Sequence, residues 1–271
     1  MVYVLENDNE WDRLEFQASL PPYDHRQELI NLVVPSGSSV LDAGCGSGAV
    51  TRYLAERFPS SQVFGCDLSQ DRINRSKRLA ETQKSSNLNF QEANLNQLPY
   101  LDHTFNLIIL RYVAQHLSPS LRSSVFAELL RCLKPGGWLH VIDFDGPFHN
   151  LYPKPPLVSE VLNQLEAQGV LDLRVGRKLP SILKEARFGA VDWKIEVFEF
   201  QGDSLRHEID LSQARLTQAF PFLESFLGVK ASQFQREFME ALQDPQVVYF
   251  YNKFFVKGQK PHRHDLSIVK S

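Results

Sequence analysis

The residues best suited to hold a ligand form a glycine-rich stretch, VLDAGCGSG, at residues 40–48. Three glycines fall within five positions, directly after a short apolar run. Glycine lets the backbone turn sharply and approach a ligand closely, because it has no side chain. The stretch follows a predicted strand and precedes a predicted helix, which is the context of a nucleotide-type binding loop. By itself the loop does not choose between a dinucleotide and another adenosine-bearing cofactor.

A carboxylate follows these glycines at the distance that a bound ribose would require. Asp67 ends the next apolar run, QVFGCD, 19 residues after Gly48. At the end of a second parallel strand, its two oxygens would accept hydrogen bonds from both ribose hydroxyls. The alternative is a structural role, in which Asp67 caps or charges the start of the following helix.

Alternating strands and helices are predicted to position this loop and this acid. Apolar runs predict strands at 38–43, 62–67, 88–93, 104–112, 138–144, 190–200 and 247–257. Amphipathic runs predict core helices at 48–58, 69–83 and 119–133, with Ser118 as N-cap, Pro119 as first helical residue and a tight turn at 134–137. We therefore expect an α/β fold with a doubly wound, mostly parallel, seven-stranded sheet and an antiparallel last strand.

The flanks predict a lid and a cap around this core. Helices are expected at 9–19 and 25–34, and again at 156–168, 176–187, 204–228 and 231–243. The predicted organisation is a helical lid at 1–36, a Rossmann-like cofactor-binding core at 37–146, substrate-cap helices with sheet strands six and seven at 147–258, and an exposed tail at 259–271.

Composition excludes several classes of function. The net charge of −3 and the pI of about 6.2 give no basic footprint for nucleic acid. No apolar run approaches the ~18 residues of a membrane span. Cys45, Cys66 and Cys132 have no metal-ligand spacing, so we expect no metal, small buried thiols and a reduced, cytoplasmic compartment. The oligomeric state stays open.

Five segments, in order over residues 40–143, resemble the class I S-adenosylmethionine-dependent methyltransferases. They are VLDAGCGSG, FGCDLS, NLNQLPY, FNLIILRYVAQHL and LKPGGWLHVID. Asp42 belongs to the first motif of that family, and the LKPGG turn before strand five is characteristic of it. The flanks resemble a bacterial subgroup that acts on small molecules. The resemblance implies S-adenosylmethionine as cofactor and methyl transfer to a small-molecule acceptor by in-line displacement.

The resemblance also implies roles for individual residues. The cofactor-binding set is Asp42, Gly44, Cys45, Gly46, Asp67, Leu68, Asn94, Leu95 and Arg111. Gly44 to Gly46 would line the methionine side, Asp67 the ribose, and Leu68, Asn94 and Leu95 the adenine. Asn94 and Asn106 stand where many members have aspartate. Arg13 and Gln17 lie one turn apart in the lid helix, where they would reach the cofactor carboxylate or form a solvated face.

Methyl transfer requires no protein nucleophile, because the donor supplies the reactive carbon. A base is needed only where the acceptor must lose a proton. The candidates at strand ends are His116, Asp145 and His149. The acceptor is expected to be a small molecule, apolar or aromatic, held by the lid and by residues after 150. The aromatic side chains available there are Tyr152, Trp193, Phe220, Phe222, Phe226 and Tyr249.

Three other functions remain open from the sequence. An NAD-dependent oxidoreductase would share the glycine loop and the acid, but not the LKPGG turn. A non-catalytic S-adenosylmethionine-binding scaffold would share the whole fold. A protein or RNA methyltransferase would share the core, although the acidic pI argues against RNA.

Overall fold

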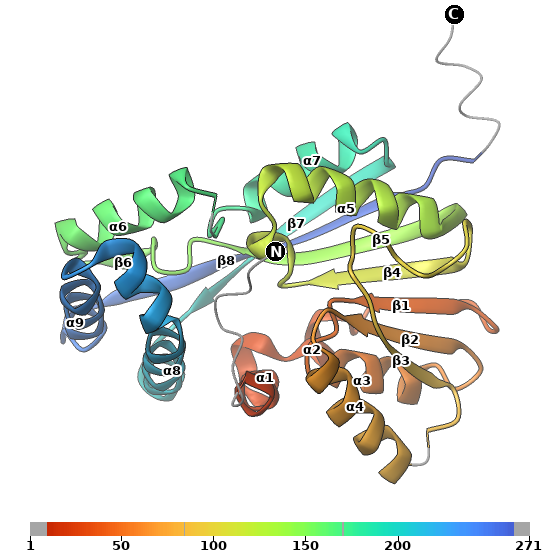
Figure 1. Cartoon of the computed structure of the whole chain (residues 1–271), viewed down its shortest axis with the longest axis horizontal. Helices are drawn as coiled ribbons and strands as arrows, with labels where there is room; N and C mark the ends of the chain where they lie inside the picture. Colours follow the sequence, from red (N-terminus) through yellow and green to blue (C-terminus); the bar gives the residue numbers. More distant parts are fainter. Residues whose placement is uncertain (1–9, 84, 170, 263–271) are drawn as a thin grey trace, which may run out of the picture.

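A computed structural model describes residues 10–83, 85–169 and 171–262. It shows a mixed sheet with helices on both faces and a lobe of helices at one end (Figure 1). Its strands are β1 (Ser39–Ala43), β2 (Gln62–Asp67), β3 (Leu88–Glu92), β4 (Phe105–Arg111), β5 (Leu133–Asp145), β6 (Leu151–Tyr152), β7 (Gly189–Glu199) and β8 (Val248–Gln259). The order β3-β2-β1-β4-β5-β8-β7, with β8 antiparallel to both neighbours, confirms the predicted sheet. The short strand β6 adds to the far end of β8.

The helices lie close to their predicted positions. They are α1 (Glu10–Ser19), α2 (His25–Glu28), α3 (Ala49–Arg57), α4 (Gln70–Thr82), α5 (Pro119–Cys132), α6 (Pro156–Ala167), α7 (Leu179–Glu185), α8 (Gly202–Leu227) and α9 (Lys230–Leu242), with short 3₁₀ turns η1 (Pro21–Tyr23), η2 (Ala114–His116) and η3 (Gly176–Lys178). Ser118 caps α5 by accepting a hydrogen bond from the Leu121 N–H, and Pro119 begins the helix, as predicted.

Burial on both faces explains why the central strands are apolar throughout. In β4, Leu107 and Ile109 belong to the core under α3, whereas Ile108 and Leu110 belong to the core under α5 and α7. Successive side chains of a strand point to opposite faces. A strand covered on both sides therefore reads as the unbroken apolar run LIIL.

A second helical lobe surrounds the far end of the long strand β8. Helices α6, α8 and α9 gather there, and α1 lies between this lobe and the core helices α3 and α4 (Figure 1). Tyr249 and Tyr251 of β8 are buried among the apolar side chains of the three lobe helices. The strand thus joins the sheet to the lobe, and α1 lies at their junction.

Four local expectations were wrong in detail. The predicted helix at 25–34 ends at Glu28, because the Arg57 guanidinium binds the carbonyls of Leu29, Ile30 and Leu32 and so satisfies an irregular backbone. The predicted turn at 134–137 is part of β5, where the backbone shifts register against β4. The other two differences concern the second half of the chain.

Strand β7 is an edge strand with most of its side chains exposed, although the alternating apolar and polar residues at 190–200 predict a half-buried strand. The first residues of the predicted exposed tail are packed against the core. Lys260 exchanges backbone hydrogen bonds with Gly136 and Gly137, so the chain stays packed beyond residue 259. Its ammonium donates to the carbonyls of Leu130 and Leu133 at 2.7 and 2.8 Å.

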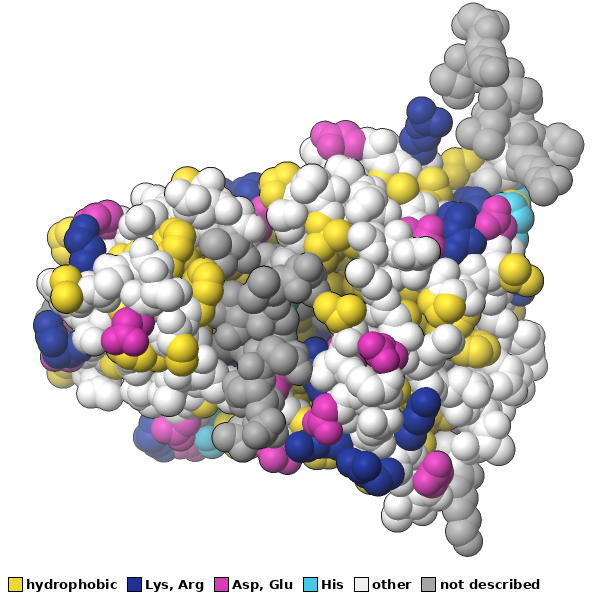
Figure 2. All heavy atoms as spheres, in the orientation of Figure 1, with side chains coloured by type: hydrophobic (Ala, Val, Ile, Leu, Met, Phe, Trp, Pro, Cys, Tyr) yellow, Lys and Arg dark blue, Asp and Glu magenta, His cyan; other side chains and the backbone are white. Residues whose placement is uncertain are grey.

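The surface carries mixed charge. On the face shown in Figure 2, acidic and basic side chains of the described residues are interspersed. A nucleic-acid-binding face would instead gather lysine and arginine. Within the described ranges, no helix is both long and apolar enough to cross a bilayer.

Lys260 offers a test of how the C-terminal end supports the core. We expect Lys260→Met to lower the free energy of unfolding by about 1–2 kcal/mol, because the ammonium caps the last carbonyls of α5. Urea unfolding measures the change. The matched control is Lys257→Met, whose exposed pair with Asp192 should contribute less than about 0.5 kcal/mol. Equal losses in the two variants would contradict the capping role.

Candidate functional site

The glycine loop after β1 is attached to the end of β2. The Gly44 and Cys45 N–H groups donate to the Cys66 carbonyl at 2.8 and 2.9 Å. The Gly46 N–H donates to Asp67 Oδ2 at 2.9 Å. Gly44 and Gly46 have φ of +76° and +55°, a region that favours glycine. The loop and the acid predicted from the sequence therefore meet in space.

The second oxygen of the Asp67 carboxylate is also engaged. Arg72, in the first turn of α4, donates to Oδ1 at 2.8 Å, and the Ser69 N–H donates to the same atom at 3.0 Å. Both Asp67 and Arg72 are buried. The carboxylate thus binds both the glycine loop and the start of α4, whose N-cap is Ser69. Sequence reasoning missed Arg72, although its position five residues after the acid was a usable signal.

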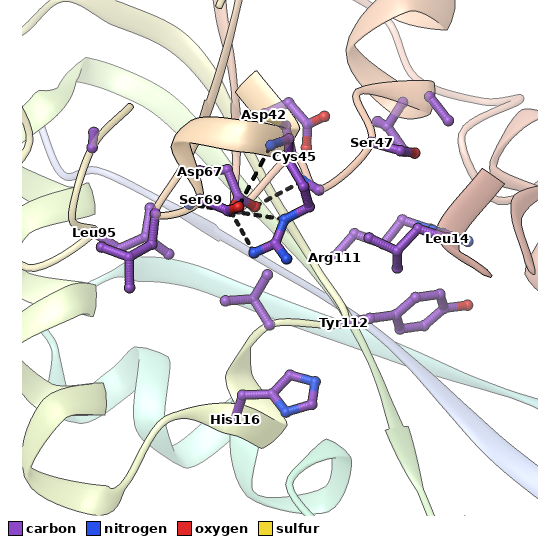
Figure 3. Close-up of a pocket in the computed structure, with 18 of the residues that line it drawn as sticks. Leu14, Asp42, Cys45, Ser47, Asp67, Ser69, Leu95, Arg111, Tyr112 and His116 are labelled. Atoms are coloured by element: carbon purple, nitrogen blue, oxygen red, sulfur yellow. Dashed lines mark hydrogen bonds and ion pairs between the residues drawn. The ribbon is translucent and has the colours of Figure 1, made fainter. Parts of the chain in front are cut away.

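These elements enclose a cavity of about 410 Å³ at the carboxyl ends of the strands, here called the strand-end cavity. A ligand site at this place is general for open parallel sheets. In Figure 3, Asp42 and Asp67 lie at one end of it, Leu95 and Leu14 on opposite sides, and His116 at the other end. Ten of the predicted cofactor residues line it: Gln17, Asp42, Gly44, Cys45, Gly46, Asp67, Leu68, Asn94, Leu95 and Arg111. Arg13 does not line it.

Asp42 lies at the bottom of this cavity, at the end of β1. It accepts a hydrogen bond of 2.6 Å from the Thr51 hydroxyl. Burial raises the pKa of the Asp42 carboxyl to about 6, although the Thr51 hydrogen bond and the positive charge of Arg111 act in the opposite direction. A carboxylate held in so little water is well placed to attract a positively charged ligand.

A second cavity, of about 170 Å³, lies beside the first and is here called the apolar cavity. Eleven of its 21 lining residues are leucine or phenylalanine, and those from the lobe helices include Leu162, Leu165, Leu216, Phe222 and Phe234. Four residues line both cavities: Leu14, Gln17, Tyr112 and His116. The two spaces therefore meet beneath α1 and beside η2.

An aromatic group lies where the two cavities meet. Tyr112 stacks on Phe144 with ring centroids 4.2 Å apart, and Tyr23 packs edge-on against both rings. Tyr112 follows β4 with φ of +57°, which is unusual for a residue with a side chain. Backbone strain of this kind often occurs at functional sites, where the surrounding contacts hold it in place.

Glu28 holds this junction together. It accepts hydrogen bonds from Arg111 Nε at 2.5 Å, from the Tyr112 hydroxyl at 2.5 Å and from Lys253 Nζ at 2.7 Å. Burial works to raise the pKa of Glu28, but Arg111 and Lys253 outweigh it and lower that pKa to about 2. The lid segment, β4 and β8 are thus joined through one buried carboxylate.

Two arginines border the apolar cavity, and each is neutralised. Arg13 makes a bidentate pair with Glu10, both contacts being 2.7 Å. Arg215 donates to Glu208 at 2.8 Å, and Glu208 also accepts from the Tyr23 hydroxyl at 2.8 Å. Gln17 accepts from both arginines and so joins α1 to α8. The polar edge of the apolar cavity therefore has no net charge from these pairs.

The three catalytic candidates lie in different surroundings. His116 lines both cavities. Burial, aided by the charge of Arg13, lowers the pKa of His116 to about 3. Asp145 is bound by Arg177, with contacts of 2.5 and 2.7 Å, and His149 lies 3.1 Å from Glu166. Neither Asp145 nor His149 lines either cavity.

Among the aromatics predicted for the acceptor pocket, Phe222 lines the apolar cavity. Tyr152 and Trp193 are exposed, and Phe220 lines an open groove between α8 and α9. Tyr249 is buried and shares a hydrogen bond of 3.0 Å with Tyr251. Six further aromatic residues, which the sequence had not singled out, also line this cavity: Tyr23, Tyr112, Phe144, Phe148, Phe234 and Tyr251.

No metal site accompanies these cavities in the part of the chain that the structure describes. No cluster of three or more histidine, cysteine or acidic side chains occurs there that could hold a metal ion. Cys45, Cys66 and Cys132 are buried free thiols. Burial raises the pKa of the Cys45 thiol, which opposes its use as a nucleophile.

Comparison with known proteins agrees with this geometry. A family model described as a methyltransferase domain matches residues 40–137. The chain is 32% identical over 120 residues to the ubiquinone/menaquinone biosynthesis C-methyltransferase of Desulfotalea psychrophila, covering 44% of this chain and 47% of that protein. It is 30% identical over 153 residues to the trans-aconitate 2-methyltransferase of Acidovorax sp., covering 53% and 54%. The chain thus spans about half the length of these curated relatives.

A solved structure shows the same fold over nearly the whole chain. It is the Haemonchus contortus phosphoethanolamine N-methyltransferase 2, in complex with phosphomonomethylethanolamine and S-adenosylhomocysteine. The TM-score is 0.64 at 18% identity, and the match covers 97% of this chain and 61% of that one. The family match on residues 40–137 includes the glycine loop, Asp67 and His116. Residues 40–137 therefore carry a methyltransferase domain, and the chain around them has the Rossmann-like fold of S-adenosylmethionine-dependent methyltransferases.

Proposed function

We propose that the chain transfers a methyl group from S-adenosylmethionine to an uncharged, apolar small molecule. One observation carries the proposal, which is that the strand-end cavity and the apolar cavity meet at Leu14, Gln17, Tyr112 and His116. A donor in the first cavity and an acceptor in the second would face each other across these side chains. Such alignment is the main contribution that a protein makes to an in-line displacement.

The strand-end cavity fits the cofactor. Its volume is within the usual range for small-molecule sites. A Cβ added to Gly44 would lie 2.6 Å from the Val113 side chain, and one added to Gly46 would lie 3.1 Å from Leu14. The two glycines thus allow the loop to pack closely against Val113 and Leu14, which also line the cavity. No lysine follows the loop directly, in keeping with a ligand without phosphate groups.

The chain's own residues then have definable roles. Asp67 would accept from the ribose hydroxyls, with Gly46 and Arg72 holding its carboxylate in place. Asn94 and Leu95 border the cavity where the adenine would bind. The bound cofactor supplies an electrophilic methyl group on a positively charged sulfur. Leu14 of α1 covers the glycine loop and would keep water from the site.

The neutral polar edge of the apolar cavity favours an uncharged acceptor. Arg13 and Arg215 already form ion pairs with Glu10 and Glu208. An acidic acceptor entering the cavity would therefore lose its hydration without a new ion pair to either arginine in return. The relatives differ in this respect, because their names include a quinone pathway and trans-aconitate, and the solved neighbour binds a phosphoamine. The apolar cavity supports an uncharged acceptor that resembles a quinone rather than an acid or a phosphoamine.

His116 would serve this reaction as a neutral hydrogen-bonding group. A general base works best with a pKa near the working pH. A histidine whose pKa is about 3 holds a proton poorly at neutral pH. We therefore assign His116 the orientation of the acceptor's polar atom at the junction of the two cavities. The acceptor carbon, nitrogen or oxygen would attack without a strongly basic partner.

A transfer assay tests the proposal directly. The protein would be incubated with methyl-labelled S-adenosylmethionine and three acceptors: a short-chain quinol, trans-aconitate and phosphoethanolamine. Label on the quinol alone is the expected result. Label on an acid alone would contradict the acceptor class but keep the methyltransferase. Cofactor binding without transfer to these or to a metabolite extract would indicate a scaffold, and thermal stabilisation by NAD alone would indicate the oxidoreductase.

Asp67 should dominate cofactor affinity. We expect Asp67→Asn to weaken S-adenosylmethionine binding roughly 10- to 100-fold, because a hydrogen bond to a charged acceptor is lost. Isothermal titration calorimetry measures the dissociation constant. Glu92→Gln is the matched control, since Glu92 lies beside Asp67 on β3 but is exposed and outside the cavity. Unchanged affinity in Asp67→Asn would remove the ribose role.

Ala219 provides a test of the acceptor cavity. This α8 residue lines the apolar cavity but not the strand-end cavity. Ala219→Phe should fill the space and raise the acceptor KM at least about tenfold, while the S-adenosylmethionine dissociation constant stays the same. Ala167→Phe, at the exposed end of α6, is the control. Normal acceptor kinetics in Ala219→Phe would place the acceptor elsewhere.

The pKa of His116 has a consequence for stability. Folding lowers that pKa from 6.5 to about 3, so between these pH values the unfolded chain binds a proton that the folded protein does not. The contribution of the neutral ring to stability is therefore complete above pH 6.5 and is lost as the pH falls toward 3. Between pH 6.5 and 5, the wild-type free energy of unfolding should fall faster than that of His116→Asn, by up to about 1.4 kcal/mol per pH unit. Urea unfolding at several pH values measures both slopes. Parallel curves would show that His116 titrates normally.

A further inference from the structure

Strand β7 leaves one long edge of the sheet uncovered. It comprises 11 residues and, among the described strands, pairs only with β8. Nine of those residues have a register partner on β8. The opposite edge of β7 has no strand partner among the described residues. An exposed edge of this kind presents unpaired N–H and C=O groups to any further strand.

The side chains on one face of this edge are apolar and exposed. Trp193, Ile195 and Val197 alternate along β7 and therefore point to the same face. Their exposed fractions are 53%, 44% and 58%. Trp193 stacks on the Phe254 ring of β8 at 6.1 Å, so the strip continues from the core packing. A contiguous apolar strip at a sheet edge usually marks a contact surface.

The other face of the same segment carries one positive and one negative charge. Lys194 and Glu196 form an ion pair within the strand, and both side chains are more than half exposed. Charged side chains can also protect a sheet edge against pairing. Here, however, the two charges have opposite sign and lie symmetrically about Ile195.

This symmetry makes the segment complementary to itself. In an antiparallel pair of two β7 strands centred on Ile195, residues equally distant from Ile195 would face each other. Each Lys194 would then lie opposite the Glu196 of the other copy, and each Trp193 opposite Val197. Directly opposite residues of an antiparallel pair share a face, so the apolar strips would also join. A two-fold contact between identical patches has this form.

We propose that two copies of this chain associate through β7, edge to edge and antiparallel, to form one continuous sheet. The occupant of the edge is a second copy, because an antiparallel copy of Lys194–Ile195–Glu196 places a glutamate opposite each lysine. None of the three central residues lines either cavity. The interface therefore leaves both cavities open and does not depend on the proposed methyl transfer.

The oligomeric state of the full chain tests this proposal. Sedimentation velocity over a range of protein concentrations should show a dimer for the wild type. Lys194→Glu places glutamates opposite each other across the axis, and Glu196→Lys does the same with lysines. Each single variant should raise the dimer dissociation constant roughly tenfold or more. The double variant Lys194→Glu/Glu196→Lys restores the opposite charges and should restore the dimer.

A matched control separates a local effect from a general charge effect. Lys230→Glu changes the same charge on the remote helix α9, where the lysine pairs with Glu160, and the dimer should persist. Circular dichroism confirms that every variant is folded. A monomeric wild type, single variants that remain dimeric, or a double variant that stays monomeric would each overturn the proposal. Ile195→Asp gives a second check, because it places two carboxylates on the axis and should separate the copies.

Discussion

The site depends on one hydrogen bond, from the Gly46 N–H to Asp67 Oδ2. It joins the loop after β1 to the end of β2, and it forms because the two parallel strands are in register from Ser39–Gln62 to Ala43–Cys66. Three of the five loop residues at 44–48 are glycines, which contribute no side-chain packing to hold the loop in shape. The carboxylate supplies that constraint, while Arg72 neutralises the acid and keeps it from being buried alone. The shape of the strand-end cavity follows from this arrangement.

A second buried carboxylate, Glu28, links the lid to the rest of the molecule. Arg111, Tyr112 and Lys253 converge on it from β4, the strand end and β8. Arg111 was predicted for the cofactor, and it does line the cavity, but its guanidinium is committed to Glu28. What remains for a ligand there is the backbone around Arg111. The charge of the side chain serves to hold Glu28 near the junction of the cavities, where the strained Tyr112 stacks on Phe144.

The charges at the edge of the apolar cavity are balanced within the protein. Arg13 and Arg215 lie at the edge of an apolar space, yet each is already paired with a buried carboxylate. Buried pairs of this kind add little net stability but fix the positions of the elements that carry them. Gln17, between the two arginines, ties α1 to α8. The lid and the lobe are therefore placed together over the junction of the cavities.

The sequence by itself determined the order of strands and helices along the chain, the loop–acid pair and ten of the eleven predicted cofactor residues that now lie around one cavity. These features follow from local patterns and from the rule that parallel strands end at one edge. Only the tertiary structure decided that Asp145 pairs with Arg177 and His149 with Glu166, away from both cavities. It also decided that β7 is an exposed edge strand. The contact between Tyr23 and Glu208 spans 185 residues. Such contacts form only when distant segments pack together, so no local sequence pattern predicts them.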